Sequence, residues 1–201
     1  AGHHRFLQKG EVNMAYQLSD INFKTVADPK GFIEECDEVY RRRVETAADK
    51  IIANRKNSPI VLLSGPSGSG KTTTARKISE ELERKGVHAH YVCMDDYFMT
   101  VDPATAPRTA EGEIDLESPL CLDMELLNEH FDLLAQGKRI YVPKYEFSRQ
   151  MRMFEPSKSI KLKKDEIVVF EGIHALNDMI TERHPEAFKL YISARSNVEF
   201  N

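Results

Sequence analysis

The segment from Ser64 to Thr73 carries the residues whose types and spacing point most directly to chemistry. Its sequence, Ser-Gly-Pro-Ser-Gly-Ser-Gly-Lys-Thr-Thr, fits the pattern G-x-x-x-x-G-K-[ST] of a phosphate-binding loop. Glycines let the backbone curl so that successive N–H groups face one anion, and the positive end of a following helix adds to the attraction. The pattern therefore predicts a site for the phosphates of a nucleotide.

Two side chains of this loop have separate predicted tasks. The Lys71 ammonium would reach the β- and γ-phosphates, and the Thr72 hydroxyl would bind Mg²⁺. A flexible Gly/Ser linker is disfavoured because an apolar run precedes the loop over 59–64 and helical spacing follows it over 73–82. The predicted nucleotide-binding residues are Gly65, Pro66, Ser67, Gly68, Ser69, Gly70, Lys71, Thr72 and Thr73.

A second group of candidate residues is acidic. Asp95 and Asp96 follow the apolar run 87–94, at the edge where open α/β sheets bind ligands. One of these carboxylates could accept the proton of an acceptor hydroxyl, or the pair could form a turn or a helix cap. Glu171 ends a further apolar run and precedes Gly172, a place where a carboxylate could act on Mg²⁺ directly or through water.

Aromatic side chains near these acids could bind an acceptor. Tyr97, Phe98, Tyr145 and Phe147 offer flat faces that suit stacking on a nucleobase, although each could equally be a core residue. Glu117, in a polar loop, could accept hydrogen bonds from a sugar diol.

The apolar pattern predicts the scaffold that would position these residues. Strand-like runs alternate with segments of helical spacing, which is typical of a parallel α/β sheet. Short pieces around Pro143 predict a small β-hairpin, and 100–118 is predicted to be a long substrate-handling loop. The predicted strands are 59–64, 87–94, 166–171 and 188–192, the hairpin pieces are 139–142, 145–147 and 151–154, and the predicted helices are 29–54, 73–82, 120–136 and 176–183.

Composition limits the remaining possibilities. The chain has 201 residues and a net charge of −4, which fits a globular domain and argues against nucleic acid as a partner. Without an apolar run of about 20 residues, no membrane span is expected. Three scattered cysteines argue against a disulfide framework, so we expect a cytoplasmic protein.

Residues 1–28 show no sustained periodicity and are predicted to form an N-terminal arm before a domain spanning 29–201.

Five segments occur in a fixed order along the chain. They are Gly-Pro-Ser-Gly-Ser-Gly-Lys-Thr-Thr (65–73), Met-Asp-Asp-Tyr-Phe (94–98), Ile-Asp-Leu-Glu-Ser-Pro (114–119) with Asp123, Val-Pro-Lys-Tyr-Glu-Phe (142–147) with Arg152, and Val-Phe-Glu-Gly-Ile (169–173). Through these segments the chain resembles the uridine kinase/phosphoribulokinase family of P-loop kinases. The resemblance covers about residues 30–195 and implies a P-loop nucleoside triphosphate hydrolase-type fold: a parallel sheet flanked by helices, with the β-hairpin as a substrate-binding insertion. It also implies transfer of phosphate from ATP, with Mg²⁺, to a sugar hydroxyl, typically the 5′-OH of uridine or cytidine.

The resemblance assigns roles to single residues. It makes Asp95 the catalytic base, Glu171 the acid linked to Mg²⁺ and Glu117 a ribose-binding residue. With the loop assignments, the predicted catalytic residues are Asp95, Lys71 and Glu171, and the predicted Mg²⁺-binding residues are Thr72 and Glu171. The predicted substrate-binding residues are Phe98, Glu117, Tyr145, Phe147, Gln150 and Arg152.

Two departures from the family concern base recognition. Uridine kinases carry a base-reading histidine where this chain has Gln150, and a tyrosine where it has Phe98. The departures leave the phosphoryl-transfer residues in place, so they affect which acceptor is bound. Two alternatives stay open: a kinase for a non-nucleoside sugar phosphate, and a nucleotide-binding regulatory module with little or no kinase activity.

A third departure lies at the chain's end. The sequence starts without Met and stops at Asn201, before the arginine-rich lid of the family. We therefore expect a segment of a longer enzyme that binds nucleotide well but turns over slowly, because arginines that stabilise the transferring phosphate would be missing. A homo-oligomer and additional domains are both left open.

Overall fold

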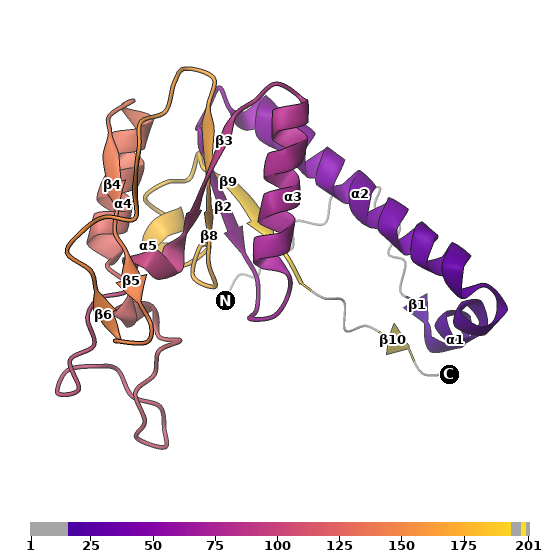
Figure 1. Cartoon of the computed structure of the whole chain (residues 1–201), viewed down its shortest axis with the longest axis horizontal. Helices are drawn as coiled ribbons and strands as arrows, with labels where there is room; N and C mark the ends of the chain where they lie inside the picture. The colour runs from indigo at the N-terminus through magenta and orange to yellow at the C-terminus, as the bar shows by residue number, and fades with distance from the viewer. Residues whose placement is uncertain (1–15, 194–197, 200–201) are drawn as a thin grey trace. The chain divides into compact units, whose positions relative to one another are not determined.

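The computed structural model describes residues 16–193 and 198–199 (Figure 1). The chain divides into two compact units, one of residues 41–193 and one of residues 1–40 with 194–201. Every predicted site residue lies in the larger unit. Among the described residues, no helix has both the length and the apolar character that a bilayer span requires.

A four-stranded sheet forms the centre of the larger unit. Its strands are β2 (Ile60–Ser64), β3 (Ala89–Cys93), β8 (Ile167–Glu171) and β9 (Phe188–Tyr191). All neighbours run parallel in the order β3-β8-β2-β9, which confirms the predicted parallel sheet (Figure 1). Because β8 lies between β2 and β3, Glu171 is in register with Leu63 on one side and with Cys93 on the other.

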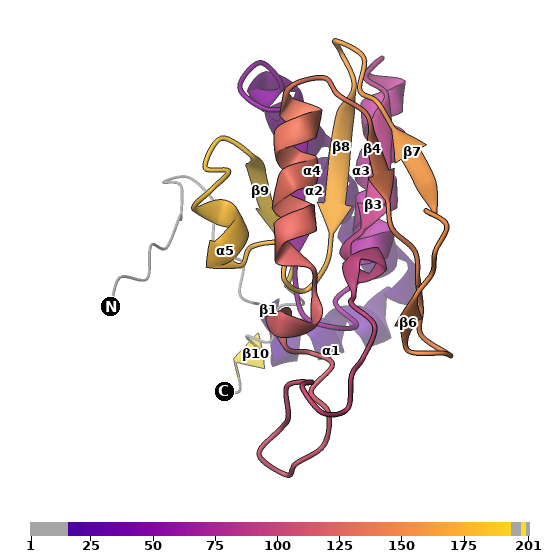
Figure 2. The same ribbon diagram turned by 90° about the vertical axis from the view of Figure 1, so that its left-hand side faces the viewer.

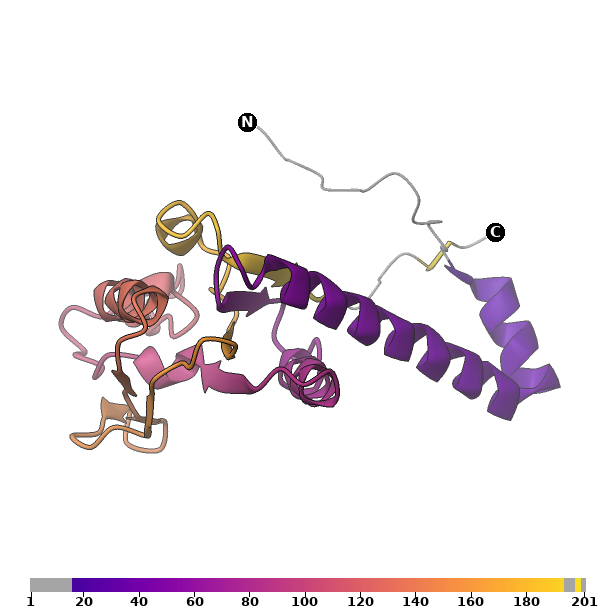
Figure 3. The ribbon, with the colours of Figure 1, turned by 90° about the horizontal axis from the view of Figure 1, so that it is seen from above.

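Helices cover both faces of this sheet (Figures 2 and 3). On one face lie α3 (Lys71–Arg84) and residues 41–54 of α2 (Pro29–Asn54), and on the other lie α4 (Met124–Ala135) and α5 (Asp178–Thr181). Alternate strand residues point to opposite faces, so two cores form. One core packs Val61, Leu63, Ile167 and Val169 against α2 and α3, and the other packs Ile60, Leu62, Val168 and Phe170 against α4 and α5.

The start of α4 differs from the prediction. We expect a helix from residue 120, but residues Pro119–Cys121 form a short 3-10 helix, η2, and α4 begins only at Met124. The reason is a local cap: the Asp123 carboxylate accepts a hydrogen bond from the Leu126 backbone N–H at 3.1 Å. Asp123 therefore ends the preceding loop and starts the helix.

Short strands beside the sheet include the predicted hairpin. Strands β5 (Tyr145–Glu146) and β6 (Met151–Arg152) pair antiparallel, as expected. The piece around 140 does not extend this hairpin, because β4 (Ile140–Val142) pairs instead with β7 (Lys158–Ile160). Only Ile160 of β7 is buried, so its sequence gives little apolar signal for a strand.

Lys158 of β7 also contacts the edge of the main sheet. Of the described strands, β3 pairs only with β8, and its other edge is therefore unpaired. The Lys158 ammonium donates a hydrogen bond to the Tyr91 backbone carbonyl and lies 5.8 Å from the centre of the Tyr91 ring. A charged side chain thus covers part of the open edge.

The smaller unit contains a helix that the sequence did not predict. Helix α1 (Leu18–Ala27) has no buried residue, which explains why residues 1–28 show no sustained periodicity. Asp28 then accepts a hydrogen bond from the Gly31 backbone N–H at 2.9 Å, near the start of α2. Strands β1 (Tyr16–Gln17) and β10 (Val198–Glu199) pair parallel. Residues 1–15 of the predicted arm lie outside the described residues.

We predict that Phe131→Ala lowers the free energy of unfolding of the larger unit by about 3–5 kcal/mol. Phe131 is fully buried on α4, and its ring lies 4.6 Å from the ring of Phe170, so truncation leaves a cavity between helix and sheet. Urea unfolding measures the loss. Phe154→Ala removes the same ring from a fully exposed position and should cost less than about 0.5 kcal/mol. Equal losses in the two variants would contradict the packing described.

Candidate active site

The predicted phosphate-binding loop lies between the end of β2 and the start of α3. Gly68 and Gly70 have φ angles of 71° and 84°, the left-handed region that favours glycine. Gly65 meets a different constraint, because a Cβ there would lie 2.2 Å from the Ile192 carbonyl oxygen. The glycines of the motif are thus required by backbone shape and by close packing.

The polar side chains of the loop differ in the hydrogen bonds that they make. The Lys71 ammonium donates to the Pro66 carbonyl at 2.9 Å, across the loop itself. The Thr72 hydroxyl donates to Glu171 Oε2 at 3.3 Å. The Ser69 hydroxyl is buried and has no hydrogen-bond partner among the described residues, which is uncommon for a buried polar group.

Glu171 is held by a residue that the sequence prediction missed. The Tyr91 hydroxyl donates to Glu171 Oε2 at 2.5 Å. Burial, followed by this contact with the carboxylate, raises the pKa of Tyr91, so the phenol stays a neutral donor. Strand alternation could have found Tyr91, because it lies two residues before Cys93 and shares a face of β3 with it.

The two neighbouring aspartates have different surroundings. Both lie on a 3-10 helix, η1 (Met94–Tyr97), directly after β3. Burial and then the charge of Glu171 raise the pKa of Asp95, while Lys71 lowers it. Burial also raises the pKa of Asp96, but the opposing charge there comes first from Lys158. Asp95 is therefore the aspartate that interacts with the phosphate-binding loop and Glu171.

His174 is a further residue that sequence reasoning missed. It follows Glu171 by three residues, and its Nε2 is buried with no hydrogen-bond partner among the described residues. An electrostatic interaction with His174 lowers the pKa of the Asp95 carboxyl. Its place just after the carboxyl end of β8 is the only sequence signal that could have indicated it.

Three predicted aromatic residues form one cluster. The ring centres of Phe98 and Tyr145 are 5.4 Å apart, and that of Phe147 lies 5.5 Å from Phe98 and 4.9 Å from Tyr145. Phe98 and Tyr145 are buried, whereas Phe147 is 53% exposed. The cluster therefore presents one ring to solvent on a buried aromatic base.

Arg152 joins this cluster to the segment that carries Asp95. Its guanidinium donates to Asp123 Oδ2 at 2.8 Å, to the Tyr97 carbonyl at 2.7 Å and to the Phe98 carbonyl at 3.2 Å. These contacts hold the end of η1 against the hairpin. They also occupy three guanidinium nitrogens, so the described role of Arg152 is to position its neighbours.

The remaining two predicted substrate residues are exposed. Gln150, at the tip of the hairpin, has a φ of 51°, and its carbonyl accepts from the Val101 backbone N–H at 3.2 Å. Glu117 lies in the loop before η2, where its backbone N–H donates to Asp115 Oδ1 at 3.0 Å. The structure does not bring either side chain into a described contact with the aromatic cluster.

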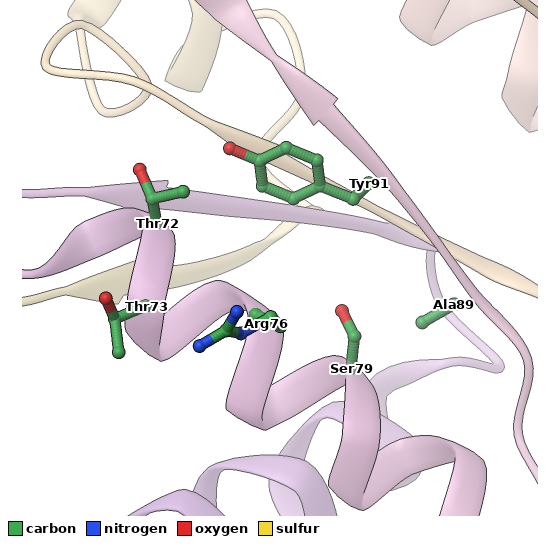
Figure 4. A pocket seen from close by; sticks show the side chains of 6 residues that line it. All are labelled: Thr72, Thr73, Arg76, Ser79, Ala89 and Tyr91. Atoms are coloured by element: carbon green, nitrogen blue, oxygen red, sulfur yellow. The ribbon is translucent and has the colours of Figure 1, made fainter.

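A cavity of about 360 Å³ opens beside Thr72, between α3 and β3 (Figure 4). Tyr91 and Ala89 line it from the strand, opposite Arg76 and Ser79 of the helix. This cavity could not be predicted from the sequence, because its wall combines side chains from α3 and β3, which lie apart in the chain. The residues lining it are Thr72, Thr73, Arg76, Ser79, Ala89 and Tyr91.

Fold and site together define a P-loop protein with a parallel sheet and the acidic groups typical of phosphotransferases. A family model described as the Phosphoribulokinase / Uridine kinase family matches residues 60–201. The chain belongs to this family, which confirms the resemblance seen in the sequence.

Individual relatives agree with this assignment. A uridine kinase of Ureaplasma urealyticum is 29% identical over 125 residues, 62% of this chain and 58% of the relative. One of Ligilactobacillus salivarius is 34% identical over 131 residues, 63% of this chain and 57% of the relative. The chain thus spans just over half the length of these curated relatives. A solved structure from Bacillus stearothermophilus, described as a possible uridine kinase, shares the fold with a TM-score of 0.56 at 20% identity, over 76% of this chain and 83% of that chain.

We predict that the thiol of Cys93, at the end of β3, resists alkylation. Burial, followed by the charge of Asp95, raises the pKa of Cys93 to about 12, so the thiol stays neutral until the pH rises toward that value. At pH 8, iodoacetamide should modify Cys93 about 1,000-fold more slowly than in denaturant, with a rate that climbs as the pH rises. Peptide mapping by mass spectrometry measures both rates. Similar rates in the native and denatured chain would show that the thiol is not buried beside Asp95.

Proposed function

We propose that this chain forms the nucleotide-binding and catalytic part of an ATP-dependent kinase whose acceptor is a sugar hydroxyl, most specifically the 5′-OH of a pyrimidine nucleoside. The observation that carries the proposal is that the phosphate-binding loop, Glu171 and Asp95 meet at one edge of the sheet. Family membership supports the same reaction class. The free cysteines support a cytoplasmic location.

In the proposed reaction, Asp95 acts as the general base. The acceptor oxygen forms a bond to the γ-phosphorus, the bond from that phosphorus to the β,γ-bridging oxygen breaks, and the nucleoside diphosphate leaves with its electron pair. Asp95 takes the proton of the attacking hydroxyl. Its raised pKa makes its carboxylate a stronger base than an ordinary aspartate, and the Lys71 ammonium offsets the negative charge that develops on the phosphates.

The residues present fit a Mg²⁺ ion as well as a polyphosphate. Thr72 and Glu171 offer two oxygen atoms 3.3 Å apart, and oxygen is the donor that Mg²⁺ prefers. Bound Mg²⁺ would supply positive charge against the phosphates. Tyr91 holds the Glu171 carboxylate in place from β3, and the unpartnered Ser69 hydroxyl is available to a phosphate oxygen.

The aromatic cluster is the proposed site for the base of the acceptor. Phe147 offers an exposed ring, and Phe98 and Tyr145 keep it in position from behind. A pyrimidine ring would stack on Phe147 because every base has a π-face. Glu117, Gln150 and Arg152 remain predicted contacts of the acceptor.

We predict that Asp95→Asn lowers kcat by about 100- to 10,000-fold, because the amide cannot accept the hydroxyl proton. Transfer of labelled phosphate from ATP to uridine and cytidine measures this loss. The variant should also unfold at a higher temperature than the parent at neutral pH, because it no longer buries a charge beside Glu171. This difference should shrink as the pH falls and Asp95 itself becomes protonated.

Nucleotide binding serves as the control for this experiment. ATP affinity should be similar in Asp95→Asn and the parent, while Lys71→Ala should lose it. Full activity of Asp95→Asn would overturn the assignment of the base. A parent chain that binds ATP but transfers phosphate to no nucleoside or sugar phosphate would favour the regulatory module instead.

We predict that Phe147→Ala raises the KM for the nucleoside about 10-fold or more and leaves ATP affinity unchanged, because one stacking face is lost. Steady-state kinetics with uridine measures the effect. Phe154→Ala, which removes a fully exposed ring that follows the same hairpin, is the matched control and should change KM less than about 2-fold. Equal effects in the two variants would rule out a specific stacking role for Phe147.

A further inference from the structure

Three side chains of types that can bind metal ions lie together at the opposite end of the sheet from the phosphate-binding loop. His88 and His90 flank Ala89, the first residue of β3, and Glu166 directly precedes β8. The strands are parallel and in register here, since His90 pairs with Val168 and the Ile167 N–H donates to the His88 carbonyl at 3.1 Å. Glu171, by contrast, is in register with Cys93 at the other end of β3, about 16 Å away at ~3.3 Å per residue.

The spacing of the two histidines favours chelation. Residues i and i+2 of a strand point to the same face, so His88 and His90 lie side by side, with ring centres 4.7 Å apart. One ligand atom from each histidine and one from Glu166 all lie within 4.8 Å of one another. Ligand atoms around a tetrahedral Zn²⁺ are about 3.4 Å apart, so movements of about 1 Å in partly exposed side chains would complete the geometry.

Hydrogen bonds already orient these side chains. His88 Nδ1 contacts Glu83 Oε1 near the end of α3, and His90 Nε2 contacts Glu166 Oε2 at 3.0 Å. A carboxylate can only accept, so His88 Nδ1 is the donor in this contact, and Nε2 is the nitrogen that a neutral His88 would offer to a metal ion. Pairs of this carboxylate–histidine type support metal ligands in many sites.

Charge at the cluster also suits a divalent cation. Glu83 and Glu166 bring two negative charges, against which Lys163 contributes one exposed ammonium 3.5 Å from Glu166 Oε1. Lys163 is 87% exposed and can move away into solvent when a cation arrives. Two imidazoles with carboxylate oxygen form a mixed set that favours Zn²⁺, Co²⁺ or Ni²⁺ over Mg²⁺.

We propose that His88, His90 and Glu166 form a binding site for a divalent transition-metal ion of the Zn²⁺ class, with Glu83 supporting His88. The ion would join the start of β3 to the start of β8, and through Glu83 it would also fasten the end of α3. Its position makes it a structural site, separate from Mg²⁺ binding at Thr72 and Glu171.

The test is a metal titration of the nucleotide-free chain after treatment with a chelator. Because His3 and His4 could bind metal on their own, every protein in the experiment carries His3→Ala and His4→Ala. Isothermal titration with Zn²⁺ and the visible d–d absorption of Co²⁺ should both report one site per chain. Excess Zn²⁺ should raise the melting temperature by about 5 °C, because the ion binds the folded state.

Four variants decide the assignment. His88→Ala and His90→Ala should each weaken Zn²⁺ binding more than about 10-fold and remove the rise in melting temperature, and Glu166→Gln should weaken it about 10-fold. Asp165→Asn, which removes a neighbouring carboxylate that pairs with Arg55, should change it less than about 2-fold. Unchanged ATP binding confirms that each variant is folded.

Two results would overturn the proposal. One is Zn²⁺ binding by His88→Ala and by His90→Ala at the affinity of the parent. The other is an equal loss in Asp165→Asn and Glu166→Gln, which would show a general attraction of cations to an acidic surface.

Discussion

Parallel pairing of β8 between β2 and β3 is the constraint on which the candidate active site depends. The three segments that carry the phosphate-binding loop, Asp95 and Glu171 are far apart in the sequence, and none of them is a site alone. The register brings Glu171 level with Leu63 on one side and with Cys93 on the other. Because all three strands point the same way, their carboxyl ends share one edge, where the loop, the 3-10 helix and the acid meet.

Bringing these groups together has an electrostatic cost. Asp95 and Glu171 are like charges in a partly buried place, and the pKa of Asp95 rises as a result. The phenol of Tyr91 and the hydroxyl of Thr72 donate hydrogen bonds to Glu171, and the Lys71 ammonium lowers the pKa of Asp95. This edge of the sheet thus holds a charge arrangement that stability alone would not favour.

The central sheet and the phosphate-binding loop could be predicted from the sequence because each is marked by a pattern of neighbouring residues. A buried strand needs an apolar run, and left-handed turns such as those at Gly68 and Gly70 need glycine. Sequence reasoning missed α1, which buries no side chain, and it missed the pairing of β4 with β7, which brings together two distant pieces of three residues each.

The residues of the candidate active site also divide into those with a local sequence signal and those without one. Lys71 and Thr72 belong to a motif that is contiguous in the sequence, and Asp95 and Glu171 stand at the ends of recognisable strands. Tyr91 donates a hydrogen bond to Glu171 across the sheet, and His174 acts electrostatically on Asp95. No spacing pattern in the sequence predicts interactions of this kind. The positioning role of Arg152 likewise becomes evident only in the structure, because two of its three hydrogen-bond acceptors are backbone carbonyls.

The ammonium of Lys158 on the Tyr91 carbonyl has a consequence for the behaviour of the protein in solution. An open strand edge is a template on which another chain can add a strand, and repeated addition leads to fibres. A positive charge seated on that edge must be displaced before a second backbone can dock there. Lys158 therefore covers the β3 edge at Tyr91, the part of that edge where its ammonium already holds the backbone carbonyl.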